Sequence, residues 1–100
     1  MKPKRSSDSE IAEQLKRLPL WRVTAGKLHR EFQFDDFVTA FGFMSRVALV
    51  AEKLDHHPDW SNSYGKVSVD LVSHDAGGIS QRDFDLASRI DAIAGSCGTR

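Results

Sequence analysis

The stretch DDFVTAFGFMSRVALVAEKLDHHP, residues 35–58, decides the fold. Its two leading aspartates can cap a helix, and its final proline disfavours helical backbone in the residue before it, so we predict a helix that runs to about Leu54. At 100° per residue its apolar side chains form two neighbouring stripes, which are Phe37, Phe41, Met44, Ala48 and Ala51 in one and Phe43, Val47, Val50 and Leu54 in the other.

The two stripes together cover about half of the helix circumference, which exceeds the ~100° that contact with a single sheet requires. We therefore expect the excess apolar surface, with the stripe from Phe43 to Leu54, to be buried against another subunit. The alternative is a helix that lies between the sheet and the other helices of its own subunit.

A pair of predicted strands lies on each side of this helix. Residues 21–24 and 28–34 precede it, residues 60–64 and 67–73 follow it, and a short turn containing glycine separates the strands of each pair. In the second strand of each pair apolar and polar side chains largely alternate, which is typical of antiparallel strands with one face in water. Each pair is therefore predicted to be a β-hairpin.

Start and stop signals in the sequence also predict a helix near each end of the chain. Residues 7–10 read as a capping box for a first helix that reaches Leu18, where a proline follows. Ser80, with Asp83 three residues on, caps a last helix that stops near Gly95.

The predicted order of elements is therefore α-β-β-α-β-β-α. It gives an α+β fold, a four-stranded antiparallel sheet with three helices packed on one face. Residues 7–100 are expected to form a single domain, and residues 1–6 a disordered tail.

Composition restricts the class of protein. The chain has 100 residues, 40% of them hydrophobic, which suits one small domain with one core. Its 14 Lys and Arg balance 14 Asp and Glu, which argues against a dedicated nucleic-acid binder, because phosphate neutralisation needs a surplus of cations. The single cysteine, Cys97, excludes an intrachain disulfide framework and a Cys-rich zinc site. No apolar run approaches the ~20 residues of a membrane span, so we expect a soluble, intracellular protein.

Three of the four histidines, His56, His57 and His74, lie next to predicted element ends, where side chains can meet a ligand. If the second hairpin brings the start of one strand near the end of its partner, these histidines share one edge of the sheet. Imidazole titrates near ~6.5, so it can donate or accept a proton around neutral pH, and a carboxylate such as Glu52 can orient it. With Trp60 beside them, the histidines predict an acid/base site for a planar substrate.

Two other interpretations of these histidines stay open. His56-His57-Pro58 can be a polar helix stop without chemistry. Alternatively, Glu52 and the three histidines can bind zinc or iron, for which imidazole and carboxylate are suitable ligands. The spacing matches only half of an HExxH motif, and adjacent histidines seldom point at one ion, so we expect no metal.

The spacing of these residues resembles that of a known family, the pterin-4a-carbinolamine dehydratases, also called 4a-hydroxytetrahydrobiopterin dehydratases. The family pattern is an acidic residue, three residues, His-His-Pro, five residues, Tyr or Trp, nine residues, His, and a downstream Asp. This chain has Glu52, His56-His57-Pro58, Tyr64, His74 and Asp83 with each gap as expected. The resemblance covers roughly residues 18–95 and departs from the family at Ser61-Asn62-Ser63, where relatives often have a larger apolar residue.

The resemblance implies an activity, the conversion of 4a-hydroxytetrahydrobiopterin to quinonoid dihydrobiopterin and water in tetrahydrobiopterin recycling, with no metal or organic cofactor. It implies that His56 and His74 are the acid/base pair and that His57 holds the leaving hydroxyl. It also implies a set of substrate-binding and supporting residues, which are Glu52, Asp55, Trp60, Ser73, Arg82 and Asp83.

The resemblance further implies protein partners. Family members are tetramers built as paired dimers, so we expect a homodimer or homotetramer. Some animal relatives are dimerisation cofactors for a homeodomain transcription factor, which makes a helical protein partner the second hypothesis. The intact set of three histidines favours the enzyme, because binding a helix does not need them. We expect no direct contact with nucleic acid or membrane, and a location in the cytoplasm or also in the nucleus.

Overall fold

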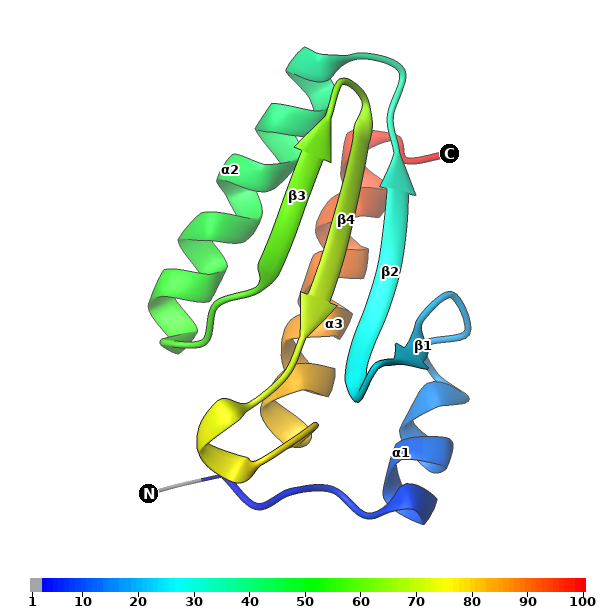
Figure 1. Ribbon diagram of the computed structural model, residues 1–100. Coiled ribbons are helices and arrows are strands. Elements are labelled where there is room, and N and C mark those ends of the chain that lie inside the picture. The colour runs from blue at the N-terminus through cyan, green and yellow to red at the C-terminus, as the bar shows by residue number, and fades with distance from the viewer. Residues whose placement is uncertain (1–2) are drawn as a thin grey trace.

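The structure, a computed structural model, describes residues 3–100 of the chain (Figure 1). Its elements are α1 (Asp8–Leu15), β1 (Arg22–Thr24), β2 (Lys27–Gln33), α2 (Phe37–Leu54), β3 (Asp59–Ser63), β4 (Lys66–Leu71), the short 3₁₀ helix η1 (His74–Ala76) and α3 (Gln81–Cys97). The predicted fold class and element order are confirmed. The sequence did not predict η1, and α3 continues past Gly95 because the residue that ends it is Gly98, whose left-handed backbone (φ +78°) suits a helix terminus.

The four strands form one antiparallel sheet in the order β1-β2-β4-β3. The two predicted hairpins are β1–β2 and β3–β4, and the pairing of β2 with β4 joins them. In Figure 1 the long helices α2 and α3 lie behind the sheet, whereas α1 lies below β1 at one end of it. Within residues 3–100 no helix combines the length and the apolar character that a bilayer span needs.

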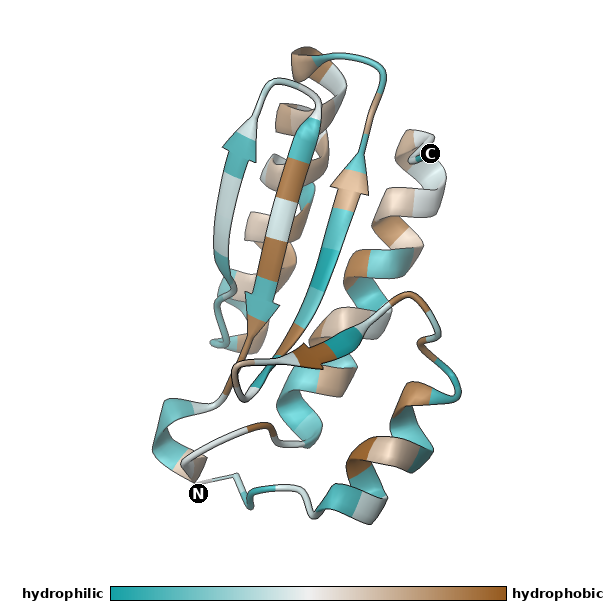
Figure 2. Cartoon of the chain, turned by 45° about the vertical axis from the view of Figure 1, so that its right-hand side comes forward, coloured by the Kyte–Doolittle hydropathy of each residue, from teal (hydrophilic) through white to brown (hydrophobic). Residues whose placement is uncertain are grey.

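The core lies between the sheet and the two long helices. β4 contributes Val67, Val69 and Leu71, all 0% exposed, and Figure 2 shows the resulting alternation of hydrophobic and hydrophilic residues along this strand. The Phe43 ring of α2 lies 5.0 Å from the Phe32 ring and 4.8 Å from the Phe34 ring, between centroids. Burial of an aromatic side chain of this kind contributes about 1.5–3 kcal/mol.

The prediction that the stripe from Phe43 to Leu54 lies in a subunit interface is wrong for Phe43 and Val47, which are 0% exposed within the subunit. Both side chains belong to the core, because α2 packs against the sheet and also against α3. Five large apolar residues of α2 stay outside the core. Leu54, at the end of the helix, is 39% exposed, and the other four lie on another part of the helix and are 51–79% exposed. We call these four the α2 apolar stripe: Phe37, Val38, Phe41 and Leu49.

The beginning of the chain also differs from the predicted disordered tail. Residues 1–2 lie outside the described residues. Arg5 pairs with Ser80 in an isolated antiparallel bridge, and Ser6 N–H donates to the Ile79 carbonyl oxygen at 2.8 Å. Residues 5 and 6 therefore have a defined place beside the segment that leads into α3. The capping box at Ser7 is present as predicted and begins α1.

Candidate active site

Two segments of the chain meet at one edge of the sheet. α2 ends at Leu54, and Asp55 turns the chain with a left-handed backbone (φ +53°) before His56 and His57. The first residue of β3, Asp59, pairs with Asp70 near the end of β4, so the segment after α2 lies beside the segment that follows β4. This second segment carries His74.

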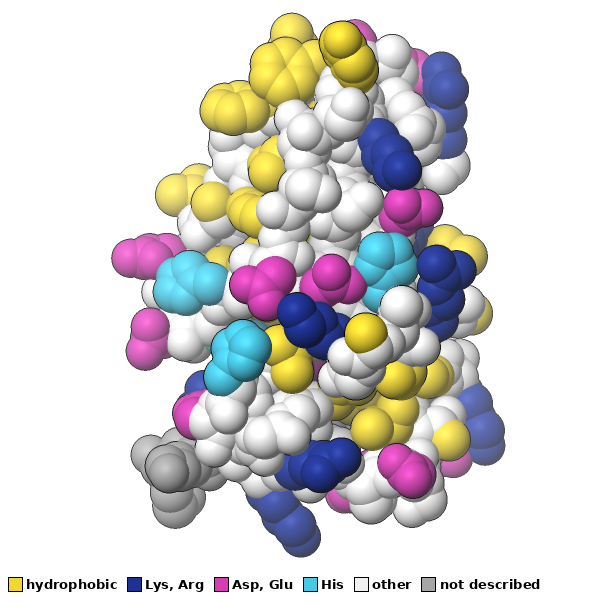
Figure 3. Space-filling model, in the orientation of Figure 1, with side chains coloured by type: hydrophobic (Ala, Val, Ile, Leu, Met, Phe, Trp, Pro, Cys, Tyr) yellow, Lys and Arg dark blue, Asp and Glu magenta, His cyan; other side chains and the backbone are white. Residues whose placement is uncertain are grey.

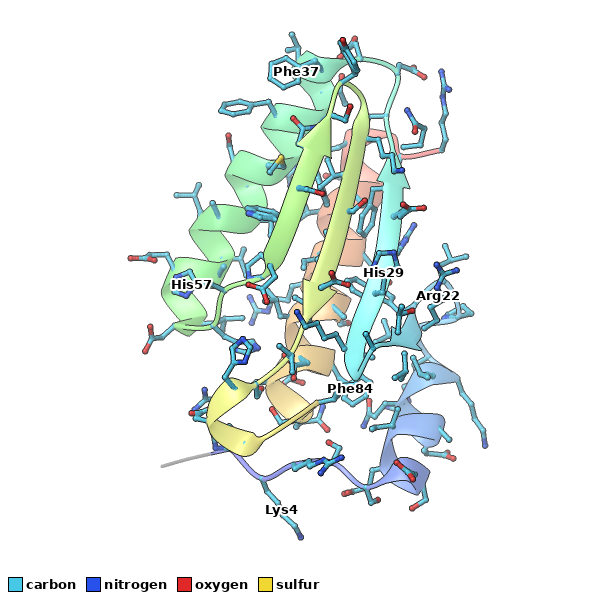
Figure 4. The ribbon with its side chains drawn as sticks, in the orientation of Figure 1. Lys4, Arg22, His29, Phe37, His57 and Phe84 are labelled. Atoms are coloured by element: carbon cyan, nitrogen blue, oxygen red, sulfur yellow. The ribbon has the colours of Figure 1, made fainter. Side chains whose placement is uncertain are left out.

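An open hollow of about 410 Å³ lies where the two segments meet, within the ~300–1,000 Å³ of typical small-molecule sites. Histidine and carboxylate side chains gather on this face of the molecule (Figure 3), and Figure 4 places His57 at the end of α2 opposite to Phe37. The hollow brings together five of the predicted site residues with three others, in the order Asp55, His56, His57, Asp59, Val72, Ser73, His74 and Asp75.

His56 is the buried histidine of the site, only 9% exposed. Its Nε2–H donates to Asp83 Oδ1 at 2.6 Å. Among residues 3–100 no hydrogen bond involves its Nδ1, and no buried side-chain nitrogen or oxygen lacks a partner, so Nδ1 is in contact with solvent. His56 can therefore exchange a proton at Nδ1 while Nε2 stays bound to the carboxylate.

Asp83 lies beneath the hollow and is 0% exposed. Its Oδ2 accepts hydrogen bonds from Ser80 N–H at 2.9 Å and from the Ser73 hydroxyl at 3.0 Å. The bond from Ser80 N–H is part of the predicted cap of α3. With His56 on the other oxygen, the buried carboxylate has three donors, which compensates for its removal from water.

His57 lies at the rim of the hollow. Its Nε2–H donates to Glu52 Oε1 at 2.8 Å, and the two side chains are 55% and 81% exposed. An ion pair this exposed contributes little stability, so the contact mainly orients the imidazole. Glu52 therefore contacts His57 and not His56, although it lies one helical turn before His56 in the sequence.

His74 begins η1 and is 81% exposed. Its Nε2 is 3.9 Å from Asp59 Oδ2, and Lys27 Nζ is 3.7 Å from the same oxygen. Next to it, Asp75 Oδ2 is 3.6 Å from a guanidinium nitrogen of Arg82. His74 is thus the most exposed imidazole of the site, with Asp59 near its ring and Asp75 next to it in the chain.

Four predicted site residues do not line the hollow. Glu52 and Asp83 act through the histidines that they contact, and the other two are Trp60 and Arg82. Trp60 pairs in register with Val69, whose side chain is buried, and packs against the core from the helix side of the sheet. A guanidinium nitrogen of Arg82 contacts Asp75, which lines the hollow. The sequence analysis missed Asp59 and Asp75, although each follows a residue of the His-His-Pro and His motif directly, which is the signal that could have found them.

Carboxyl groups elsewhere in the structure have lowered pKa values. A hydrogen bond from Lys66 across the strands lowers the pKa of Glu31. The backbone N–H of Thr39 lowers the pKa of Asp36, and that of Ser7 lowers the pKa of Glu10. The last two effects belong to the caps of α2 and α1, so they concern helix stability and not the hollow.

The predicted alternative of a metal site finds no support in the geometry. Within the described part of the chain no three His, Cys, Asp or Glu side chains are grouped so that they could hold a metal ion. The Nε2 atoms of His56 and His57 are each bound to a different carboxylate. The absence of a metal cofactor stays a prediction.

Comparison with known proteins identifies close relatives. A family model described as pterin 4 alpha carbinolamine dehydratase matches residues 4–93. A relative from Solibacter usitatus, whose name refers to the same dehydratase, is 52% identical over 88 residues, which is 88% of this chain and 93% of that protein. A relative from Nitrobacter winogradskyi with the same name is 53% identical over 96 residues, or 94% and 95% of the two chains.

Solved structures agree with these sequence matches. The crystal structure of a transcriptional coactivator/pterin dehydratase from Brucella melitensis has a TM-score of 0.88 and 46% identity, over 92% of this chain and 100% of that one. A pterin dehydratase-like RuBisCO assembly factor of the alpha-carboxysome shares the fold alone, with a TM-score of 0.62 and 22% identity over 75% and 87% of the two chains. The family match over residues 4–93, together with about half of all residues identical to named relatives, shows that this chain belongs to the pterin-4-alpha-carbinolamine dehydratase family, whose members are hydro-lyases.

Proposed function

We propose that the hollow between His57 and His74 binds a 4a-hydroxytetrahydropterin and dehydrates it to the quinonoid dihydropterin. The observation that carries the proposal is the arrangement of the histidines. His56 is held from behind by the buried Asp83 carboxylate, and His57 and His74 line the same hollow. Family membership supports the dehydration of a pterin carbinolamine.

The reaction needs one base and one acid. The N5–H proton of the substrate must be removed, its electron pair must form the C4a=N5 double bond, and the C4a–O bond must break. The hydroxyl group leaves as water once it has gained a proton. One water molecule is lost in total, without oxidation or reduction, so two proton-transfer groups suffice. General acid/base help of this kind contributes ~10²–10⁴-fold each.

His56 is the base in this proposal. Its Nε2–H is bound to Asp83, so the lone pair of Nδ1 is available for the N5 proton, and the carboxylate stabilises the imidazolium that forms. His74 is the acid, because its exposed ring can regain a proton from water after each turnover. His57, oriented by Glu52, holds the leaving hydroxyl. Asp55 at the end of α2 and Asp75, which contacts Arg82, border the bound ring.

The physiological role that follows is regeneration of tetrahydrobiopterin. The substrate is the product that aromatic amino-acid hydroxylases release, and dehydration prepares it for reduction.

The proposal is tested by the decay of 4a-hydroxytetrahydropterin, followed by ultraviolet absorbance with and without protein. We expect His56→Ala and His74→Ala each to lower kcat by ~10²-fold, the modest end of the acid/base range. His29→Ala is the matched control, because that histidine is bound to Asp70 on the open face of the sheet. Full activity in folded His74→Ala protein would refute the assignment.

We also propose that the α2 apolar stripe is covered by a second copy of the chain. The observation behind this proposal is four large apolar side chains on one helix, each at least 51% exposed. Figure 3 shows hydrophobic side chains gathered over α2. Burying them at ~1.5–3 kcal/mol each would offset ordinary association costs. Sedimentation decides between a homo-oligomer and a chain that stays at 11.2 kDa, and the second result would favour a different helical protein as the occupant.

A further inference from the structure

Two buried serine hydroxyls contact one another next to the hollow, one of them from Ser73, a residue of its lining. Ser73 is 1% exposed and Ser80 is 0% exposed, and their hydroxyl oxygens are 2.7 Å apart. Ser73 Oγ is also 3.0 Å from Asp83 Oδ2. The hydroxyl of Ser73 is therefore occupied by the protein itself, although this residue was expected to bind substrate.

The direction of these hydrogen bonds follows from the number of protons. A serine hydroxyl has one proton to donate, and an ionised carboxylate can only accept. The Ser73 hydroxyl must therefore donate to Asp83 Oδ2, which leaves it only lone pairs for its other contact. The bond between the two serines is then donated by Ser80. The result is a series of two hydrogen bonds, in which the Ser80 hydroxyl donates to Ser73 and the Ser73 hydroxyl donates to Asp83.

We propose that Ser73 and Ser80 are positioning residues that fix the tautomer of His56. Two donors, the Ser73 hydroxyl and the Ser80 N–H, hold Asp83 Oδ2, so Oδ1 is turned toward His56. A carboxylate oxygen in that place requires a proton on Nε2 of the imidazole, which leaves the lone pair on Nδ1. The role in catalysis rests on the proposed function, in which Nδ1 of His56 is the base.

Ser73 also sets the position of the second histidine, through its main chain. Its N–H donates to the Gly78 carbonyl oxygen at 3.0 Å, and Gly78 N–H donates back to the Ser73 carbonyl oxygen at 3.2 Å. These two bonds close the loop that begins with His74. Ser73 therefore connects both halves of the acid/base pair, its side chain behind His56 and its main chain at the base of the His74 loop.

The tautomer of His56 can be measured without any substrate. In ¹⁵N-labelled protein, long-range ¹H–¹⁵N correlation distinguishes a protonated ring nitrogen from one with a lone pair. We expect the proton on Nε2 in the wild type. In Ser73→Ala and Ser80→Ala both nitrogen shifts move toward intermediate values, because Asp83 loses its fixed orientation and the two tautomers exchange. Ser73→Thr keeps the hydroxyl and retains the wild-type signal.

Kinetics supply the second readout. We expect kcat of Ser73→Ala to fall about 10-fold, the lower end of what outer-shell partners of functional histidines contribute, with KM within about 2-fold, because no substrate contact is removed. Ser88→Ala is the matched control, since Ser88 is exposed on the same helix, α3. Circular dichroism confirms that each variant is folded, and the Ser73→Thr variant covers the case in which alanine is not tolerated.

The nitrogen shifts and the kinetics together distinguish failure of the positioning role from failure of the proposed function. A wild-type proton on Nδ1, or an unchanged Nε2 signal in both alanine variants, overturns the proposal. So does a rise in KM at constant kcat for Ser73→Ala, which would mean that Ser73 binds substrate. Wild-type protein that does not dehydrate the pterin refutes the proposed function, and the nitrogen shifts still decide the positioning role.

Discussion

Asp83→Asn is the smallest change that tests how His56 works. The variant keeps the shape of the side chain and replaces one acceptor oxygen by an NH₂ donor. Oδ2 faces two donors at 2.9 and 3.0 Å, so the amide oxygen stays there. The NH₂ group then takes the place of Oδ1, 2.6 Å from His56 Nε2. Two donors cannot share this contact, so His56 must move its proton from Nε2 to Nδ1.

The expected fall in kcat of Asp83→Asn follows from the loss of the general base. With Nδ1 protonated, His56 has no lone pair left to accept the N5 proton. Loss of a general base costs ~10²–10⁴-fold, and we expect a fall in kcat of at least ~10²-fold, because His57, His74 and water remain. KM should change little. The weaker hydrogen bonds of a neutral amide cost about 1 kcal/mol, which lowers the Tm of a domain of this size by roughly 4–8 °C.

The assay is the absorbance decay of 4a-hydroxytetrahydropterin in a stopped-flow instrument, with circular dichroism at the same temperature. Asp35→Asn is the matched control, because that carboxylate is exposed and contacts Arg100 far from the hollow. It should keep wild-type kcat. Folded Asp83→Asn protein with wild-type kcat would refute the reasoning, since it would show that His56 does not depend on the carboxylate.

Three further predictions concern assembly, cofactors and pH. If the proposed homo-oligomer forms, Leu49→Glu should dissociate it and leave the subunit folded, whereas Val47→Glu should unfold the subunit, because Val47 is 0% exposed. Sedimentation and circular dichroism separate the two effects, and a folded Val47→Glu monomer would contradict the packing. Activity should survive prolonged treatment with a chelator, and a loss that zinc restores would reverse this expectation. The pKa of Asp36 is lowered in the folded chain, so its ionised cap stabilises at neutral pH and this contribution disappears as pH falls through the folded value. The Tm advantage of wild type over Asp36→Asn should therefore be larger at pH 7 than at about pH 2, and a constant difference would show that the charge has no role.

The α2 apolar stripe begins at the N-terminal end of α2, away from the histidine hollow, so assembly and chemistry can be tested separately at Phe37 and Val38. Phe37 marks one end of α2 and His57 the other in Figure 4. The two ends are joined by one helix of 18 residues, about 27 Å at 1.5 Å per residue. A Val38→Glu variant that prevents self-association and leaves kcat unchanged would show that one subunit holds a complete site, because Val38 is 79% exposed near the other end of α2.

The sequence by itself determined the order of the elements and the choice of candidate site residues. Alternation along β4 and the caps at Ser7 and Asp36 act between residues that are close in the chain, so they can be recognised without a fold. The spacing of His56, His57 and His74 belongs to the same class of signal. Side-chain periodicity also determined that α2 has more apolar surface than one sheet can cover.

Only the tertiary structure decided which partner each histidine takes and which face of α2 stays exposed. Glu52 lies one helical turn before His56 in the sequence. The left-handed turn at Asp55 nevertheless directs His56 inward to Asp83, 27 residues away, and Glu52 contacts His57 instead. The physical reason is that such contacts depend on how α3 packs behind the sheet edge, a long-range arrangement that no local pattern contains. The exposed face of α2 is likewise a result of the tertiary structure. Val47 and Leu49 are both apolar, but the sheet and α3 cover Val47 and leave Leu49 exposed to solvent.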